Sequence, residues 1–195
     1  MEQKDWKQRL FDAIKRKKRY AGYHSWDDKC TVEGMITKRV VDHLISSGRI
    51  EGKGEITCSN QDPPDCVYKD PSGREYGIEV SEIVHAPSRH AGEAGERVTP
   101  HEWTPLVLHE IVQKRVIEKS YRDHSRAEAW LVLHTGEYDL RGLDVLQAFI
   151  STWPALDLKW FDRVFILGHY DPTVGGVPLV EFNPAGSPYF EVTRG

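Results

Sequence analysis

The fold of this protein is indicated by two short stretches, Pro64–Tyr68 (PDCVY) and Tyr76–Glu82 (YGIEVSE). Each is an apolar segment of strand length, and the first carries Asp65 whereas the second carries Glu79. Residues 70–73 (DPSG) between them form a strong turn sequence, which predicts two adjacent strands joined by a hairpin. The hairpin would bring Glu79 back to face Asp65.

These two acids indicate a chemistry as well as a fold. Glu79 lies between two β-branched residues on a predicted central strand, where an ionised carboxylate is costly to bury unless it is paired or bound to a cation. A turn after proline explains the acid at Asp65, but it does not explain the acid at Glu79. Magnesium accepts such oxygen ligands, keeps several waters and can activate a water against a phosphodiester. The pair therefore predicts a site for a divalent metal.

The spacing of apolar residues predicts helices and strands on both sides of this hairpin. Helices are expected at 2–19, 31–47, 106–121 and 143–153, and strands at 55–59, 66–69, 75–83, 130–134 and 163–167, with one or two edge strands at 177–182 and 189–192. This order suggests a mixed sheet flanked by helices, which is an α/β fold. Residues 85–105 lack apolar periodicity and are predicted to form a mobile loop, a candidate lid.

The bulk composition predicts a single folded domain. The chain has 195 residues, of which 39% are hydrophobic and 29% charged, so it can build one substantial core and does not resemble a disordered chain. We divide it into an N-terminal helical extension (1–30), a core (31–170) and C-terminal edge strands (171–195). Because the net charge is -4, nucleic-acid binding would have to rest on a local basic surface.

The sequence also predicts a location and a redox state. No apolar run reaches the roughly 18 residues of a membrane span, and the first residues lack the apolar core of a signal peptide, so a cytoplasmic protein without membrane contact is expected.

The three cysteines, Cys30, Cys58 and Cys66, are odd in number and have no metal-ligand spacing. This argues against a disulfide framework and against a thiolate zinc site, and predicts three reduced, buried cysteines.

The arrangement of Asp65 after Pro64, a hairpin, and Glu79 within an apolar strand resembles the PD-(D/E)XK nuclease superfamily. The resemblance covers roughly Thr31–Leu167, since the flanking helices and the next strand come in the order of that superfamily. It implies a restriction-endonuclease-like fold with an αβββαβ core. It further implies that Asp65 and Glu79 hold Mg2+ or Mn2+, that the Val80 carbonyl is another ligand, and that the protein hydrolyses phosphodiester bonds of DNA or RNA, with DNA the favoured substrate.

One position departs from that superfamily. Its members commonly have lysine two residues after the strand carboxylate, where this chain has Ser81. Some members supply the lysine from a neighbouring element, and the following helix offers Lys114 and Lys119. The segment Ile117–Tyr121 resembles the lysine-tyrosine helix end of nuclease-like families, which favours Lys119. Lys114 has an ordinary explanation, because Glu110 lies one turn before it in the order that favours a surface ion pair.

A further metal ligand is expected from the preceding helix. Glu33, in its first turn, resembles the helical glutamate that many members of the superfamily direct at the metal. An acid in the first turn is also stabilised by the helix dipole, so this position has two explanations.

Other functions are compatible with the same residues. A nuclease-like fold with a decayed site, marked by Ser81, would be a nucleic-acid-binding or protein-interaction module. A small-molecule hydrolase that uses the histidine-rich loop is a third reading, although the histidines match no zinc spacing. Compact nuclease domains often act as dimers or with a partner, so a homodimer or a protein partner is compatible with the resemblance.

Overall fold

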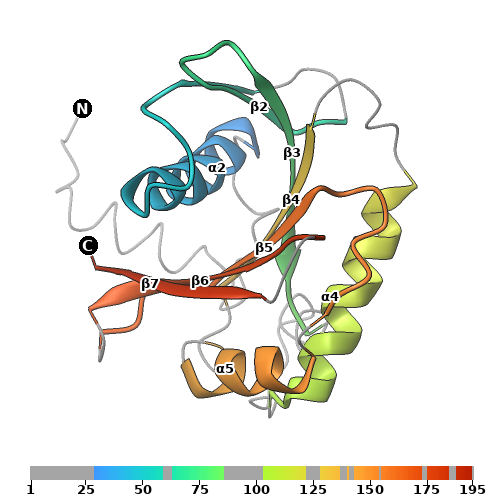
Figure 1. Cartoon of the computed structure of the whole chain (residues 1–195). Helices are drawn as coiled ribbons and strands as arrows, with labels where there is room; N and C mark the ends of the chain where they lie inside the picture. Colours follow the sequence, from blue (N-terminus) through green and yellow to red (C-terminus); the bar gives the residue numbers. More distant parts are fainter. Residues whose placement is uncertain are drawn as a thin grey trace, which may run out of the picture.

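The computed structural model describes residues 29–58, 63–85, 103–121, 128–136, 140, 143–153, 155–172, 175–184 and 188–194. The described residues form the helices α2 (Lys29–Ser46), α4 (Pro105–Ser120) and α5 (Leu143–Thr152), and the strands β1 (Glu55–Cys58), β2 (Cys66–Lys69), β3 (Glu75–Ile83), β4 (Glu128–Thr135), β5 (Arg163–Leu167), β6 (Gly176–Phe182) and β7 (Tyr189–Arg194) (Figure 1). The helix predicted at 2–19 and most of the loop predicted at 85–105 lie outside the described residues.

The strands form one mixed sheet in the order β1-β2-β3-β4-β5-β6-β7. The central strands β3, β4 and β5 are parallel, and the pairs on either side of them are antiparallel. The predicted α/β fold with a mixed sheet flanked by helices is therefore confirmed. Of the one or two edge strands predicted near the C-terminus, the structure has one, β7, because β6 lies between β5 and β7.

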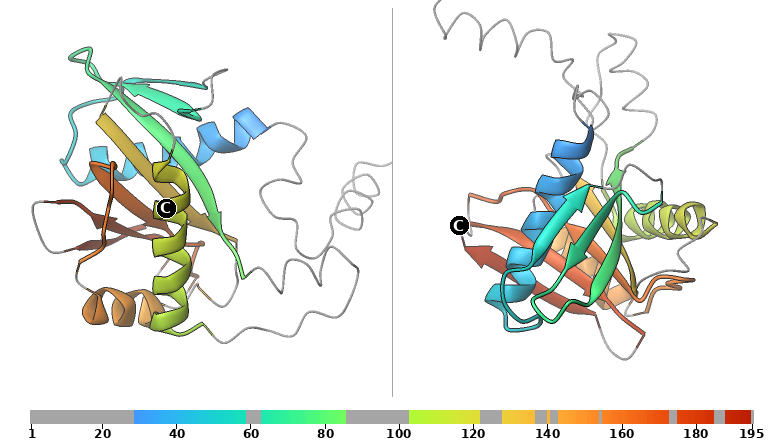
Figure 2. Two further views of the ribbon diagram at one scale, coloured as in Figure 1. Left: turned by 90° about the vertical axis from the view of Figure 1, so that its right-hand side faces the viewer. Right: turned by 90° about the horizontal axis from the view of Figure 1, so that it is seen from above.

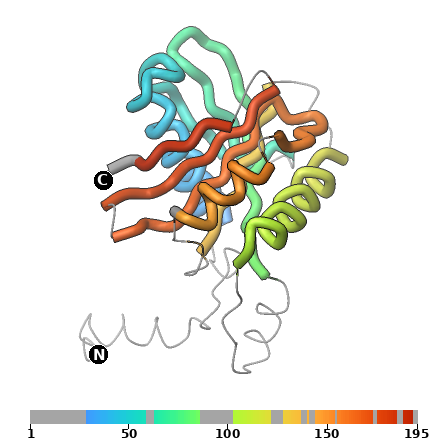
Figure 3. The backbone as a smooth tube through the Cα atoms, turned by 60° about the horizontal axis from the view of Figure 1, so that its bottom comes forward, coloured from blue at the N-terminus to red at the C-terminus, as the bar shows by residue number. Residues whose placement is uncertain are grey.

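Helices cover both faces of the sheet (Figures 2 and 3). Strand β4 shows the division, since Trp130 and Val132 belong to the core beneath α2, whereas Leu131 and Leu133 belong to the core beneath α4 and α5. A strand that is buried on both faces is apolar at almost every position, which is why β4 and β5 read as continuous apolar runs. Within the described residues, no helix is long and apolar enough to cross a bilayer.

The alternation along β3 decides where its acid points. Ile78 and Val80 belong to the core beneath α2, and successive side chains of a strand point to opposite faces, so Glu79 points to the face covered by α4. Helix α4 begins after Thr104, whose hydroxyl accepts a hydrogen bond from the Val107 N–H at 3.3 Å. The helix continues to Ser120 and therefore holds Lys119 in its last turn.

The predicted redox state of the cysteines is wrong for two of the three. Cys30 in the first turn of α2 and Cys58 at the end of β1 form a disulfide, with their Cα atoms 5.8 Å apart. The partners are 28 residues apart in sequence, and they meet because α2 packs beside β1. Cys66 is the free, buried thiol that was expected. Burial raises its pKa to about 11, so this thiol stays protonated and unreactive near neutral pH.

Candidate metal centre

Two buried carboxylates from neighbouring strands face one ammonium group. Asp65 directly precedes β2 and is 4% exposed, and Glu79 in the middle of β3 is 1% exposed. The Lys119 Nζ atom lies 2.6 Å from Glu79 Oε2 and 3.7 Å from Asp65 Oδ2. Asp65 and Glu79 therefore share one environment. The ammonium group between them comes from Lys119 on helix α4, which packs against the sheet.

Asp65 is held in its ionised form. Its Oδ2 atom accepts a hydrogen bond from the Val80 N–H at 2.9 Å. Burial raises the pKa of Asp65, but the Val80 hydrogen bond and the charges of Lys119 and Lys29 outweigh burial, so the net pKa lies below its ordinary value. The carboxylate is therefore negative over the whole physiological pH range.

The Val80 carbonyl points to the same side of β3 as this hydrogen bond. In a strand, the N–H and the C=O of one residue point to the same neighbour. The pairing of β2 with β3 ends at Cys66 opposite Ile78, so beyond it the backbone of Val80 faces Asp65 instead of a strand. The Val80 backbone therefore faces Asp65 at this edge of β3, whereas the Glu79 side chain points to the face covered by α4.

A second lysine approaches the same carboxylates from α2. The Lys29 Nζ atom lies 3.1 Å from Glu33 Oε1 and 3.2 Å from Asp65 Oδ1. Burial lowers the pKa of Lys29, but the charge of Asp65 and the hydrogen bonds to Glu33 and Asp65 outweigh burial and raise it above its ordinary value. Sequence reasoning missed Lys29, although its position four residues before Glu33 matches the spacing of a helical ion pair.

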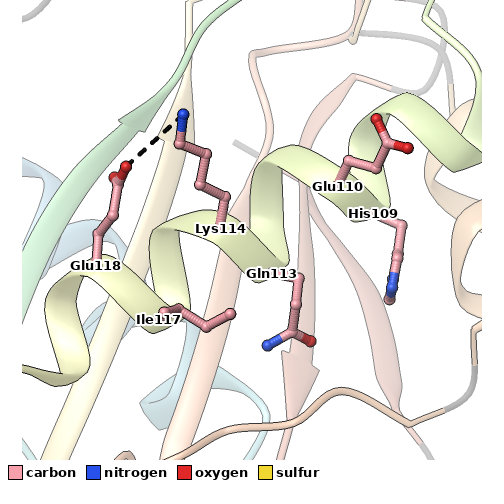
Figure 4. Close-up of a pocket in the computed structure, with 6 residues that line it drawn as sticks. All are labelled: His109, Glu110, Gln113, Lys114, Ile117 and Glu118. Atoms are coloured by element: carbon pink, nitrogen blue, oxygen red, sulfur yellow. Dashed lines mark ion pairs between the residues drawn. The ribbon is translucent and has the colours of Figure 1, made fainter.

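Lys114 lies apart from these groups. Its side chain is 74% exposed, and its Nζ atom is 3.9 Å from Glu118 Oε1 (Figure 4). Lys114 therefore forms a surface ion pair, as the sequence predicted. Its partner is Glu118, one turn after Lys114, and not the expected Glu110. The side chain borders an open hollow of about 460 Å³ on α4, which is lined by His109, Glu110, Gln113, Lys114, Ile117 and Glu118.

The oxygens present suit a loosely held hard cation. Within the described residues, no group of three or more His, Cys, Asp or Glu side chains is arranged to hold a metal ion. A closed structural zinc site needs four such ligands, but magnesium is usually bound by one or two carboxylates, waters and substrate phosphates. Asp65, Glu79 and the Val80 carbonyl therefore fit Mg2+ or Mn2+.

Comparisons with known proteins give little further guidance. No family model matches this sequence, and no curated protein matches it. Among solved structures, the chain is similar to SfsA from Pyrococcus furiosus in complex with Ca2+, at 12% identity and a TM-score of 0.25. The match covers 84% of this chain and 61% of the SfsA chain. A likeness this weak supports no statement about function.

Proposed function

We propose that this protein is a metal-dependent nuclease of the PD-(D/E)XK type, which hydrolyses phosphodiester bonds of DNA or RNA, with DNA the favoured substrate. The observation that carries the proposal is the convergence of the buried Asp65 and Glu79 carboxylates on the Lys119 ammonium. Burying two carboxylates together is costly, and a fold that needed only packing would place apolar residues there. The sequence resemblance described above supports the same activity.

Each residue of the centre has a distinct role in this proposal. Asp65, Glu79 and the Val80 carbonyl would hold Mg2+ or Mn2+, and Glu33 would act directly or through a water. The bound metal would supply an activated water and a Lewis acid for the phosphodiester. Lys119 replaces the lysine that is absent at Ser81, and its ammonium would orient the attacking water and offset negative charge that develops on the phosphate.

A non-catalytic role is the second candidate, and one observation favours it. The ammonium groups of Lys29 and Lys119 already lie within 4 Å of the carboxylates of Glu33, Asp65 and Glu79. Such pairing would stabilise these carboxylates without any metal. A nuclease-like fold with this site would then be a nucleic-acid-binding or protein-interaction module.

Cleavage assays on the purified full chain distinguish the two candidates. Supercoiled plasmid, single-stranded DNA and RNA are each incubated with Mg2+, with Mn2+ and with a chelator. We expect metal-dependent cleavage that Asp65→Asn and Glu79→Gln reduce by at least about a thousandfold, since each removes a charged metal ligand. Asp42→Asn is the matched control, because Asp42 is an exposed acid of α2 that pairs with Lys38 and lies outside the centre.

The proposal is wrong if either variant, folded by circular dichroism, cuts as fast as the wild type. It is also wrong if the wild type shows neither cleavage nor metal-dependent protection against unfolding, which is the result that the binding module predicts.

A further inference from the structure

The centre contains one more cation than the proposed chemistry needs. If all five groups are ionised, Glu33, Asp65 and Glu79 carry three negative charges and Lys29 and Lys119 carry two positive charges, which leaves a net charge of -1. One divalent ion changes this local charge to +1, and a second ion would change it to +3. Because the carboxylates are buried, such an excess of positive charge would be costly.

The two oxygens of Asp65 face two different cation positions. Oδ1 lies 3.2 Å from Lys29 Nζ, whereas Oδ2 accepts the Val80 N–H at 2.9 Å and faces Lys119. A carboxylate that bridges two metal ions divides its oxygens in the same way, one for each ion. Here the position at Oδ1 is shared with Glu33 and contains the Lys29 ammonium.

The backbone of Lys29 is anchored beside this position, and 56% of its side chain is exposed. The next residue, Cys30, is covalently joined to Cys58 on β1, which fixes the first turn of α2 beside the sheet. Lys29 and Glu33 lie one helical turn apart, so their contact needs no movement of another element.

We propose that Lys29 occupies the place of a second divalent cation, between Glu33 and Asp65, so that this centre binds one metal ion and not two. The inference rests on the proposed nuclease function, and it adds a number of ions and a role for Lys29. Asp65 and Glu79 would hold the single ion, and Lys29 would supply the positive charge that a second ion supplies in a two-metal site. Lys29 is a positioning residue here, since it acts through Glu33 and Asp65.

Counting bound Mn2+ on the full chain tests this inference without any measurement of activity. Isothermal titration and the electron paramagnetic resonance signal of free Mn2+ should both give one ion per wild-type chain. Lys29→Met should bind two, because removal of the ammonium opens the position between Glu33 and Asp65. Lys29→Arg keeps the charge and should bind one. Lys38→Met is the matched control, since Lys38 also pairs with an acid one turn later on α2, and it should bind one.

The number of Mn2+ ions bound per chain distinguishes a failure of this inference from a failure of the proposed nuclease function. Two ions on the wild type, or one ion on folded Lys29→Met, overturn the role of Lys29 and leave the nuclease proposal standing. No bound Mn2+ on any of the proteins overturns both.

If Lys29→Met does not fold, wild-type crystals soaked in Mn2+ decide the question. One anomalous peak between Asp65 and Glu79, with the Lys29 ammonium still at Glu33, supports the inference. A second peak beside Glu33 overturns it.

Discussion

Lys119 and Lys114 lie on the same helix, yet their surroundings differ completely. Five positions along an α-helix correspond to about 140° of rotation about its axis, so the two side chains leave α4 in different directions. Lys119 points into the space between the sheet and the helix, where Glu79 Oε2 is 2.6 Å away. Lys114 points to solvent and pairs with Glu118. The pair thus offers a comparison in which the helix and the residue type are constant.

Replacing Lys119 by methionine should remove a charge that acts on the phosphate. We expect Lys119→Met to lower metal-dependent cleavage by about 10²–10³-fold, the usual effect of removing one group that stabilises transition-state charge. Urea denaturation should also show a less stable protein in the absence of metal, because two buried carboxylates lose their shared cation. Lys114→Met should change neither quantity. Equal cleavage rates for the two variants would exclude a role for Lys119.

Individual site residues could be predicted from the sequence where the pattern of neighbouring residues was enough to identify them. Glu79 stood out because an acid is unusual in an apolar strand, and Asp65 because the predicted hairpin places it opposite Glu79; the structure brings both to Lys119. Whether these residues catalyse a reaction is still a prediction. Lys29 could not be chosen, because its contact with Asp65 depends on how α2 packs beside the sheet.

A disulfide joins the first turn of α2 to the end of β1. It fixes the part of α2 that carries Lys29 and Glu33 of the candidate metal centre. The bounds of β2, β3 and β5 were predicted correctly, since clear turn sequences and apolar runs mark them. Thr31, which was predicted to cap this helix, lies inside α2. The pairing of Cys30 with Cys58 depends on tertiary contact, so spacing in the sequence could not reveal it.

Reduction of this disulfide should destabilise the protein. A bridge between residues 28 positions apart is expected to contribute about 3 kcal/mol, mainly by restricting the unfolded chain. Thermal unfolding with and without dithiothreitol should therefore show a lower Tm under reducing conditions. The double variant Cys30→Ser, Cys58→Ser should have that lower Tm in both buffers and should not respond to dithiothreitol. An unchanged wild-type Tm on complete reduction, verified by thiol counting, would contradict this prediction.

Across the whole molecule, the sheet separates two apolar cores, and its C-terminal strands belong to both. Leu179 of β6 packs in the core beneath α2, whereas Val180 and Phe182 pack in the core beneath α4 and α5. The sequence predicted the fold class because the order of helices and strands restricts the topology. It did not predict that β6 is an interior strand, because that depends on β7 pairing outside it.

A buried acid on β6 connects the segment after α2 with strand β5. Glu181 is 1% exposed and contacts the guanidinium of Arg49, which follows α2, and that of Arg163 on β5. It therefore ties the α2 layer to the C-terminal half of the sheet. Three strands, β3, β4 and β5, lie between it and the strand that Asp65 precedes, so the contact is structural and remote from the candidate metal centre.

Glu181→Gln should lower stability without changing metal binding. The substitution leaves two guanidinium groups without their buried counter-charge, and we expect a loss of about 2 kcal/mol in urea denaturation. This is below the 3–5 kcal/mol typical of fully buried pairs, because both arginines are partly exposed. Glu75→Gln is the control, since Glu75 forms an exposed pair with Lys69 and such pairs contribute little. Mn2+ affinity should be the same in both variants, and a weakened affinity in Glu181→Gln alone would show that the two halves of the sheet are coupled.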